Sequence, residues 1–299
     1  MHLGLRYVTR FRYSGPVWES HNALRACPAE DERQRLHSYA VEVTPGAPVF
    51  TYRDRWGTRV DTFGILEPHH ELVVAAEARV ETDPVTPPDD VPLARLDDGY
   101  REAHWIYLQP TRHARSDTGL AGAARDAVSG IGGVVEAVRA VERCVHDAIE
   151  YRPGATSIGD DVAAIWASGA GVCQDFAHVT SAMLRALGIG ARYVSGYFYA
   201  ADSADGSAPD GEIVVATHAW VEAAIPGGGW WPIDPTNRSP VGERHVKIGH
   251  GRDYDDVTPL RGVYYGETEH SLAAEVTMAP GSIVRRIVPD LAAPAARDQ

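Results

Sequence analysis

A segment rich in proline and aspartate, residues 83–92, separates two parts of the chain that have different hydrophobic periods. It holds four prolines and three aspartates in ten residues. Proline fixes φ and lacks a backbone N–H, so this segment is predicted to be a linker without regular structure. Apolar residues alternate along 1–82 between turn sequences such as Ser14-Gly15-Pro16. That pattern predicts an all-β domain, an antiparallel sandwich or barrel.

Beyond the linker, apolar residues recur at intervals of three and four, which is typical of helices. Helices are predicted over Val135–Ile149 and from about Val172 to a stop at Gly188. Later runs rich in β-branched and aromatic residues predict strands over 191–200, 213–225 and 230–234. We therefore expect an α+β fold, in which the β domain over 1–82 and the linker over 83–92 precede a helix-plus-antiparallel-sheet domain over 93–290. A flexible tail is expected over 291–299.

Net charge and cysteine content limit the classes of binding partner that we expect. The chain has 299 residues and a formal net charge of −13, a sign that disfavours nucleic acid and anionic membranes as partners. The three cysteines, Cys27, Cys144 and Cys173, have no short spacing, so they predict neither a disulfide framework nor a zinc site. No apolar run has the length of a signal peptide or a membrane span, and cytoplasmic residence is the expectation.

Three side chains suited to nucleophilic catalysis follow one another along the chain. Cys173 lies in Gly-Val-Cys-Gln-Asp-Phe, His218 in Thr-His-Ala-Trp-Val-Glu, and Asp234 in Trp-Pro-Ile-Asp-Pro-Thr. A free thiol has a pKa of about 8.5 and reacts as thiolate, so it needs a group that removes its proton near neutral pH. An imidazole can do this, and a carboxylate on the other ring nitrogen fixes the tautomer and stabilises the charged ring.

The local sequences predict how these groups are placed. Cys173 falls in the first turn of a predicted helix after two glycines, where unpaired N–H groups and the helix dipole favour the thiolate. His218 and Asp234 lie on two predicted strands joined by the Pro226-Gly227-Gly228-Gly229 turn, and the resulting hairpin brings its open ends together. Taken alone, a cysteine is more often a small buried apolar residue, and a strand histidine is more often structural.

The same sequences resemble the transglutaminase-like superfamily of papain-related cysteine enzymes. The resemblance rests on Gly171-Val-Cys-Gln-Asp-Phe-Ala-His, on Leu184-Arg-Ala-Leu-Gly-Ile-Gly, on His218-Ala-Trp-Val-Glu and on Asp234-Pro-Thr-Asn. The N-terminal part is similar to the β domain that bacterial members carry. The resemblance implies a papain-related catalytic domain in which Cys173 is the nucleophile, His218 the base and Asp234 the residue that orients His218. Arg55-Trp56-Gly57 departs from the Gly-Asn more usual in that β domain, which affects a turn and not the chemistry.

Four further residues are candidate substrate contacts: Gln174, Trp220, Arg252 and Tyr254. Core packing is the competing interpretation for Trp220, and a solvated position is the competing one for Gln174. His178 is expected to be structural, because it lies off the face of Cys173. We expect no cofactor and no metal, since no group of His, Cys and Asp has the spacing of zinc ligands and the acidic clusters lack the spacing of a calcium loop.

These features favour a cysteine-dependent acyl-transfer enzyme that acts on peptide, isopeptide or other amide bonds through a thioester. Hydrolysis is the favoured outcome, because water needs no second binding site. Two alternatives stay open: a transglutaminase that transfers the acyl group to an amine, and a noncatalytic binding protein on the same scaffold. The expected partner is a peptide or protein amide substrate. The sequence does not indicate an oligomeric state.

Overall fold

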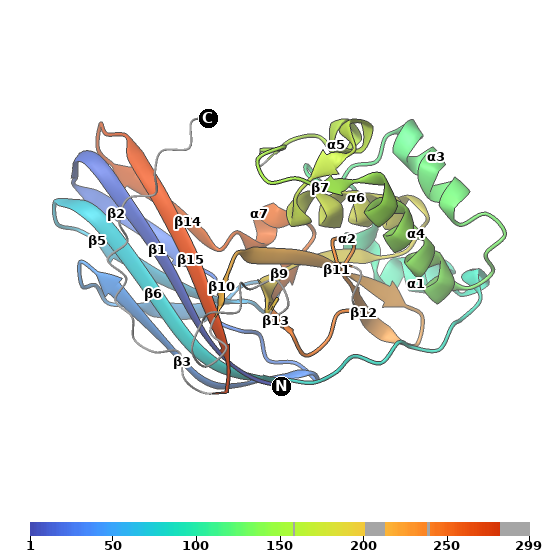
Figure 1. Cartoon of the computed structure of the whole chain (residues 1–299), viewed down its shortest axis with the longest axis horizontal. Coiled ribbons are helices and arrows are strands. Elements are labelled where there is room, and N and C mark those ends of the chain that lie inside the picture. Colours follow the sequence, from blue (N-terminus) through green and yellow to red (C-terminus); the bar gives the residue numbers. More distant parts are fainter. Residues whose placement is uncertain (158, 201–212, 238–239, 282–299) are drawn as a thin grey trace. The chain divides into compact units, whose positions relative to one another are not determined.

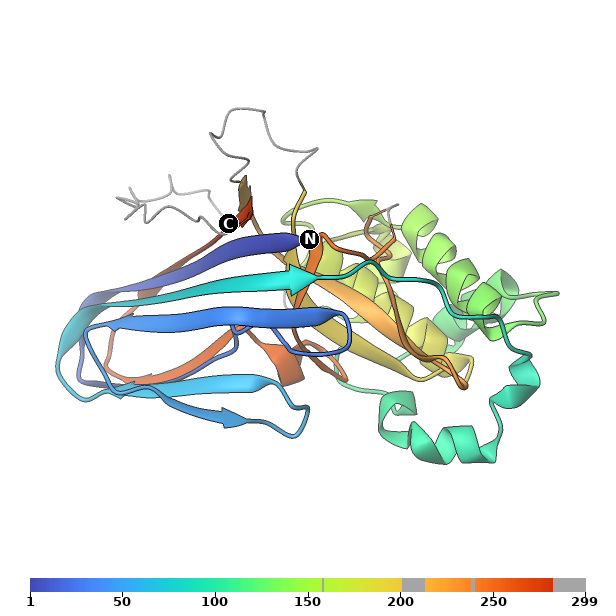
Figure 2. The ribbon, with the colours of Figure 1, turned by 90° about the horizontal axis from the view of Figure 1, so that it is seen from below.

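The computed structural model describes residues 1–157, 159–200, 213–237 and 240–281, which fall into two compact units (Figures 1 and 2). The first unit comprises Met1–Thr82 with the described parts of Tyr197–Ala216 and Pro259–Gln299, and the second comprises Asp83–Gly196 and Thr217–Thr258. The predicted tail over 291–299 lies outside the described residues. No helix of the described part is long and apolar enough to cross a membrane.

The first unit is built from two antiparallel sheets. One sheet has the order β10-β15-β1-β6-β3 and the other the order β14-β2-β5-β4. Their strands are β1 (His2–Val17), β2 (Glu19–Leu24), β3 (Gln34–Thr44), β4 (Phe50–Arg53), β5 (Arg59–Ile65), β6 (His69–Thr82), β10 (Ile213–Val215), β14 (Leu260–Tyr265) and β15 (His270–Pro280). Alternation decides which face is buried: along β6, Leu72, Val74, Ala76, Ala78 and Val80 form part of the core.

The domain boundaries differ from those predicted. The sequence assigned 93–290 to one domain, but β14 pairs with β2, and β15 pairs with β1 along eleven residues from Leu3↔Pro280 to Tyr13↔His270. The short strand β10 extends the same sheet by pairing with β15. The β unit therefore draws strands from three separate stretches of the chain. Strand propensity reveals that such strands exist but not which strands they pair with. Residues 83–91 form no helix or strand, and Pro92 makes an isolated bridge with Gly133.

The second unit combines helices with a four-stranded sheet of order β12-β11-β9-β13. The sheet strands are β9 (Ala191–Phe198), which continues into the first unit at Tyr197, β11 (Thr217–Ile225), β12 (Gly229–Ile233) and β13 (His245–Gly251). A parallel pair is formed by β7 (Glu150–Tyr151) and β8 (Ala170–Gly171). The helices are η1 (Leu93–Arg95), α1 (Asp98–Ala103), α2 (Trp105–Leu108), α3 (Thr118–Ala127), α4 (Val134–Ala148), α5 (Val162–Ser168), α6 (Cys173–Ala186) and α7 (Tyr254–Val257).

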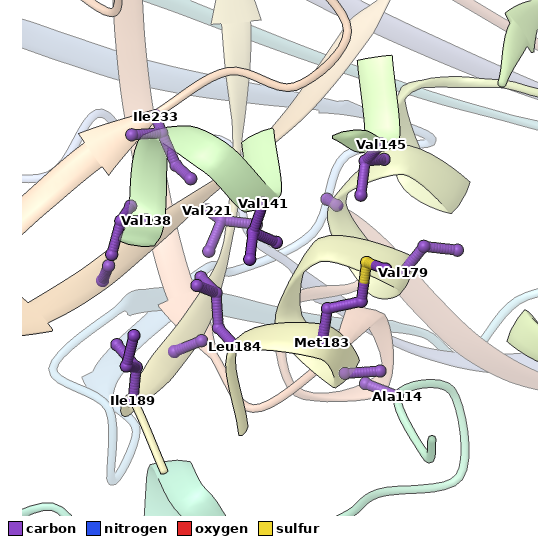
Figure 3. Packing of buried hydrophobic residues seen from close by; sticks show 14 of the residues in the cluster. Ala114, Val138, Val141, Val145, Val179, Met183, Leu184, Ile189, Val221 and Ile233 are labelled. Atoms are coloured by element: carbon purple, nitrogen blue, oxygen red, sulfur yellow. The ribbon is translucent and has the colours of Figure 1, made fainter. Parts of the chain in front are cut away.

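Helix α6 lies at the centre of this unit and contacts α3, α4, α5 and β11. Val138, Val141 and Val145 recur along α4 and belong to the same buried cluster as Val179 and Met183 of α6 (Figure 3). These side chains are fully buried, and burial of each stabilises the unit by roughly 1.5–3 kcal/mol. The apolar periods predicted both helices, because a helix with one apolar stripe must bury it against a neighbour. The packing fixes the position of the N-terminus of α6.

Candidate active site

Cys173 is the first residue of α6 and so lies in the first turn of a helix, where the sequence predicted it. The carboxylate of Asp175 accepts a hydrogen bond from the N–H of Val172 at 2.8 Å, and the hydroxyl of Thr156 donates to the same oxygen. Asp175 is buried, and burial raises its pKa. A Cβ at Gly171 would lie 2.9 Å from the Asp175 side chain, so only glycine fits beside this cap. The two residues together hold the backbone turn that presents the half-buried thiol.

His218 and Asp234 lie on the two arms of the predicted hairpin. β11 pairs with β12 in the register Val221↔Ile233 to Ile225↔Gly229, and Gly227 at the turn has φ of 76°. His218 is near the start of β11, and Asp234 directly follows β12. Antiparallel pairing brings these open ends side by side. The imidazole Nε2 lies 2.7 Å from the Asp234 Oδ2.

The other side of the His218 ring interacts with the thiol of Cys173. His218 hydrogen-bonds the side chain of Cys173, and the Cys173 Sγ lies 3.9 Å from the carbonyl oxygen of Thr217. Because Nε2 bonds Asp234, the other ring nitrogen, Nδ1, is the one that can take the thiol proton. Burial lowers the pKa of His218, but the hydrogen bonds with Asp234 and Cys173 outweigh burial and raise that pKa to about 10. The geometry therefore favours a protonated imidazole in this position.

Asp234 has further partners that sequence reasoning missed. The carboxylate is fully buried and accepts hydrogen bonds from the Thr236 N–H at 2.9 Å, the Asn237 side-chain amide at 2.7 Å and the His245 Nε2 at 3.2 Å. Burial raises the pKa of Asp234, but the hydrogen bonds from His218 and His245 outweigh it and hold that pKa well below its ordinary value. The carboxylate is thus ionised at neutral pH.

His245 acts on Asp234 as a neutral donor. The Gly242 N–H donates to its Nδ1 at 3.3 Å, so the ring proton resides on the Nε2 that faces Asp234. Burial, opposed by the hydrogen bond to Asp234, lowers the pKa of His245. His245 begins β13, a separate strand, and no local sequence signal links it to Asp234. Asn237 stands in the Asp-Pro-Thr-Asn motif, where its position three residues after Asp234 was the available signal.

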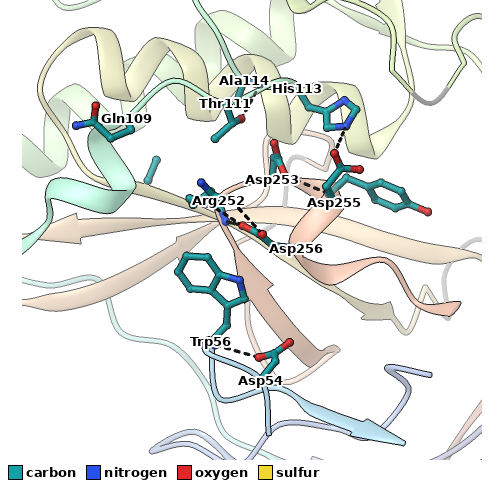
Figure 4. Close-up of polar contacts among 12 residues, drawn as sticks. Asp54, Trp56, Gln109, Thr111, His113, Ala114, Arg252, Asp253, Asp255 and Asp256 are labelled. Atoms are coloured by element: carbon teal, nitrogen blue, oxygen red, sulfur yellow. Dashed lines mark hydrogen bonds and ion pairs between the residues drawn. The ribbon is translucent and has the colours of Figure 1, made fainter. Parts of the chain in front are cut away.

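The four candidate substrate contacts are placed differently from one another. Gln174 follows Cys173 on α6 and is partly exposed. Trp220 is only 2% exposed, with its ring centroid 5.4 Å from that of His245, so it is a core residue and not a surface for substrate. Arg252 directs its guanidinium at Asp256, with 3.0 Å between Nε and Oδ2 (Figure 4). The Tyr254 N–H donates to the Nε2 of His178.

The surroundings of the thiol include two tyrosines that were not predicted. Burial raises the pKa of Tyr193 and that of Tyr151, and the charge of a Cys173 thiolate raises both further. Tyr151 is half-exposed on β7, beside the strand that leads into Cys173. Tyr193 also interacts with Tyr254 and stacks on the buried His178, at 4.8 Å between ring centroids. His178 is structural, as expected, since its ring is enclosed by Tyr193 and His113.

Comparisons with known proteins cover most of the chain. Residues 121–235 match the transglutaminase-like superfamily, and residues 3–81 match the bacterial transglutaminase-like N-terminal region. The first match contains Cys173, His218 and Asp234. The chain belongs to the transglutaminase-like superfamily.

Relatives of this superfamily member cover almost the whole chain. An uncharacterized protein of Mycobacterium leprae is 34% identical over 280 residues, 91% of this chain and 96% of the relative. An uncharacterized protein of Mycobacterium tuberculosis is 33% identical over 291 residues, 88% of each chain. Among solved structures, a candidate cysteine protease from Cytophaga hutchinsonii superposes with a TM-score of 0.72 at 25% identity, covering 92% of this chain and 90% of that one.

Proposed function

We propose that this superfamily member is a cysteine-dependent acyl-transfer enzyme that hydrolyses peptide, isopeptide or related amide bonds. The observation that carries the proposal is one connected set of side chains. Cys173 stands at the N-terminus of α6 and hydrogen-bonds His218, whose other ring nitrogen bonds the buried Asp234 at 2.7 Å. Nucleophile, base and orienting carboxylate in this order are the parts that thiol catalysis requires.

The reaction begins with transfer of the thiol proton to His218. The thiolate of Cys173 attacks the carbonyl carbon of the amide, and a tetrahedral oxyanion forms. The N-terminus of a helix offers backbone N–H groups without intrahelical partners, and because Cys173 begins α6 such groups are the candidates that would stabilise the oxyanion. When the C–N bond breaks, the imidazolium gives its proton to the leaving amine, and the acyl group stays on sulfur as a thioester.

The second half of the reaction determines the product. Water, deprotonated by His218, attacks the thioester and releases the acid together with the free thiol. An amine in place of water would give a new amide, which is the transglutaminase outcome. We favour hydrolysis because water needs no binding site of its own. The superfamily match and the candidate cysteine protease among its structural neighbours support a cysteine enzyme of either kind.

The test is a peptide library incubated with the full chain, with the products analysed by mass spectrometry. The expected result is acid product from the wild type and none from Cys173→Ala, with Cys144→Ala as the matched thiol control that keeps its activity. Circular dichroism checks that both variants fold. Processing by Cys173→Ala at the wild-type rate would overturn the proposal. Adding a primary amine tests the second branch: amine incorporated at the expense of acid would identify a transferase.

A further inference from the structure

Three side chains in the five-stranded sheet of the first unit bring metal-binding atoms together. His2, His37 and Glu81 each offer one ligand atom, and all three atoms lie within 4.8 Å of one another. They come from three neighbouring strands, β1, β3 and β6, in the order β1-β6-β3. The residues are far apart in sequence, so no short sequence motif indicates a metal site. Nothing in the mechanism proposed for Cys173 uses them.

Strand register explains why the three side chains meet. His2 of β1 pairs directly with Glu81 of β6, and directly paired residues of antiparallel strands project on the same face. On the other side of β6, Arg35 pairs with Glu81, and the register then shifts between Leu36 and Ser38. His37 lies in this irregularity, two residues after Arg35. A bulge of this kind redirects a side chain, and here the imidazole turns toward Glu81.

The distances between these ligand atoms are compatible with one bound metal ion. The His37 Nε2 lies 3.1 Å from one oxygen of Glu81, and the His2 Nε2 lies 3.9 Å from the other oxygen. Zn²⁺ bound at about 2.0–2.1 Å with tetrahedral angles separates its ligand atoms by about 3.4 Å. The two observed separations lie on either side of that value. The two imidazole rings are 5.7 Å apart between centroids, so both can present Nε2 to one point.

We propose that His2, His37 and Glu81 form a binding site for a divalent transition-metal ion of the Zn²⁺ class. Two imidazoles and one carboxylate are a donor set that zinc accepts, with a water molecule in the fourth position. The ion takes the place of the proton that His37 and Glu81 share. The side chains of His2, His37 and Glu81 are 64%, 42% and 31% exposed, so an ion has access from solvent.

Binding at this position would join three strands of the sheet. Glu81 is the central ligand, since it lies on β6 between the strands of the two histidines. One neighbouring charge is Arg35, whose NH1 lies 3.6 Å from the Glu81 Oε2 and whose side chain is 75% exposed. A solvated arginine on a long stem can move away at little cost, because exposed ion pairs are weak. The net charge of −13 also favours the approach of cations.

The experiment is a calorimetric titration of ZnCl₂ into the full chain without a histidine tag, freed of metal by EDTA and dialysis. All samples carry Cys173→Ala, so that the thiol beside His218 cannot bind zinc. We expect saturable binding that His37→Ala and Glu81→Gln each weaken by at least ~10-fold, since loss of even an outer-shell partner of a metal site has an effect of that size. Zinc should also raise Tm in the parent and fail to do so in these variants.

The matched control is His21→Ala. His21 is an exposed histidine of the same unit that pairs with Glu19 but belongs to no group of three such ligands among the described residues. Its loss should leave zinc binding unchanged. The other such group in the described part is His218, Asp234 and His245, so His245→Ala is titrated as well. Binding that survives His37→Ala and disappears in His245→Ala would overturn the proposal, as would equal losses in His21→Ala and His37→Ala.

Discussion

Asp234 is held by more partners than orientation of one imidazole requires. Besides His218, it accepts hydrogen bonds from Asn237, from His245 and from the backbone that follows it. A buried carboxylate with this many donors stays ionised and cannot rotate, and both properties stabilise a charged His218. At the scale of single residues, the proposed chemistry therefore depends on a network around the carboxylate.

The first prediction concerns the carboxylate itself. Asp234→Asn keeps the size of the side chain but removes the charge and presents an N–H where the Nε2 proton of His218 needs an acceptor. We expect kcat to fall by about 10²–10⁴, as in other triads. Steady-state kinetics on a substrate found in the library screen would measure it. A near-normal rate would show that another residue orients His218.

The second prediction concerns His245 as a positioning residue. His245→Ala removes a hydrogen bond to a charged group, which contributes about 1.5–3 kcal/mol, and only part of this acts in the transition state, so kcat should fall on the order of 10-fold. His245→Gln retains a donor and should recover most of the rate. The pH–rate profile of His245→Ala should also shift on its alkaline limb, because Asp234 would hold the charged His218 less firmly. Equal rates and profiles in the Ala and Gln variants would assign His245 a purely structural role.

The third prediction separates the three thiols. Burial raises the pKa of Cys27 to about 11, and burial followed by the charge of Asp147 raises that of Cys144, so both remain protonated near neutral pH. Cys173 begins α6 and hydrogen-bonds His218, an imidazole that can remove its proton when it reacts. Iodoacetamide at about pH 7 should therefore label Cys173 first, as read by mass spectrometry of peptides. Equal labelling of Cys144 and Cys173 in the folded protein would contradict this.

At the scale of elements, the sequence predicted the features that depend on residues close to one another in the chain. A helix from about Val172, with Cys173 in its first turn, was predicted because glycines precede an apolar stripe, and the β11–β12 hairpin was predicted from its glycine-rich turn. The partners of these elements were not predictable in the same way. Core packing was the competing interpretation of Trp220, but only the tertiary structure shows that Trp220 packs with Val194 and Val241. His245 reaches Asp234 from β13, and neither propensity nor period encodes that contact.

The fourth prediction concerns Glu142 of helix α4 and the dependence of stability on pH. Burial, together with the charge of Asp234, raises the pKa of Glu142 to about 7. The unfolded value is about 4.3, so the folded state binds the proton more tightly and stability falls as pH rises between these two values. Each unit of pKa corresponds to about 1.4 kcal/mol, which gives a loss of about 3–4 kcal/mol by about pH 8.

Glu142→Gln removes this titration. Urea unfolding at about pH 5 and about pH 8 should show that the variant gains stability over the wild type at the higher pH and little at the lower one. Glu136→Gln is the matched control, since Glu136 is an exposed carboxylate of the same helix. A gain in Glu142→Gln that is the same at both pH values would show that Glu142 is not the titrating group.

At the scale of the whole molecule, the chain leaves the β unit at the linker and returns to it. The sequence predicted a β domain over 1–82 and did not predict that later strands join it. The strand patterns of β14 and β15 do not indicate which strands they pair with. In the structure β15 lies between β10 and β1, and its residue Met278 is fully buried opposite Leu5 and Ile213. The zinc ligands proposed above illustrate the same limit, since register across β1, β6 and β3 assembles them.

The last prediction tests this return of the chain. Met278→Ala removes a buried side chain and leaves a cavity, which should cost about 2–5 kcal/mol of stability. Leu272→Ala in the same strand is the control: Leu272 is 56% exposed, and surface substitutions usually change stability by at most ~0.5 kcal/mol. Hydrogen exchange should show loss of protection along β1 and β6 in Met278→Ala, because β15 hydrogen-bonds to β1 and β1 to β6. If protection along β1 did not change, β15 would not be part of the β unit's core in solution, and the predicted boundary over 93–290 would describe the molecule better.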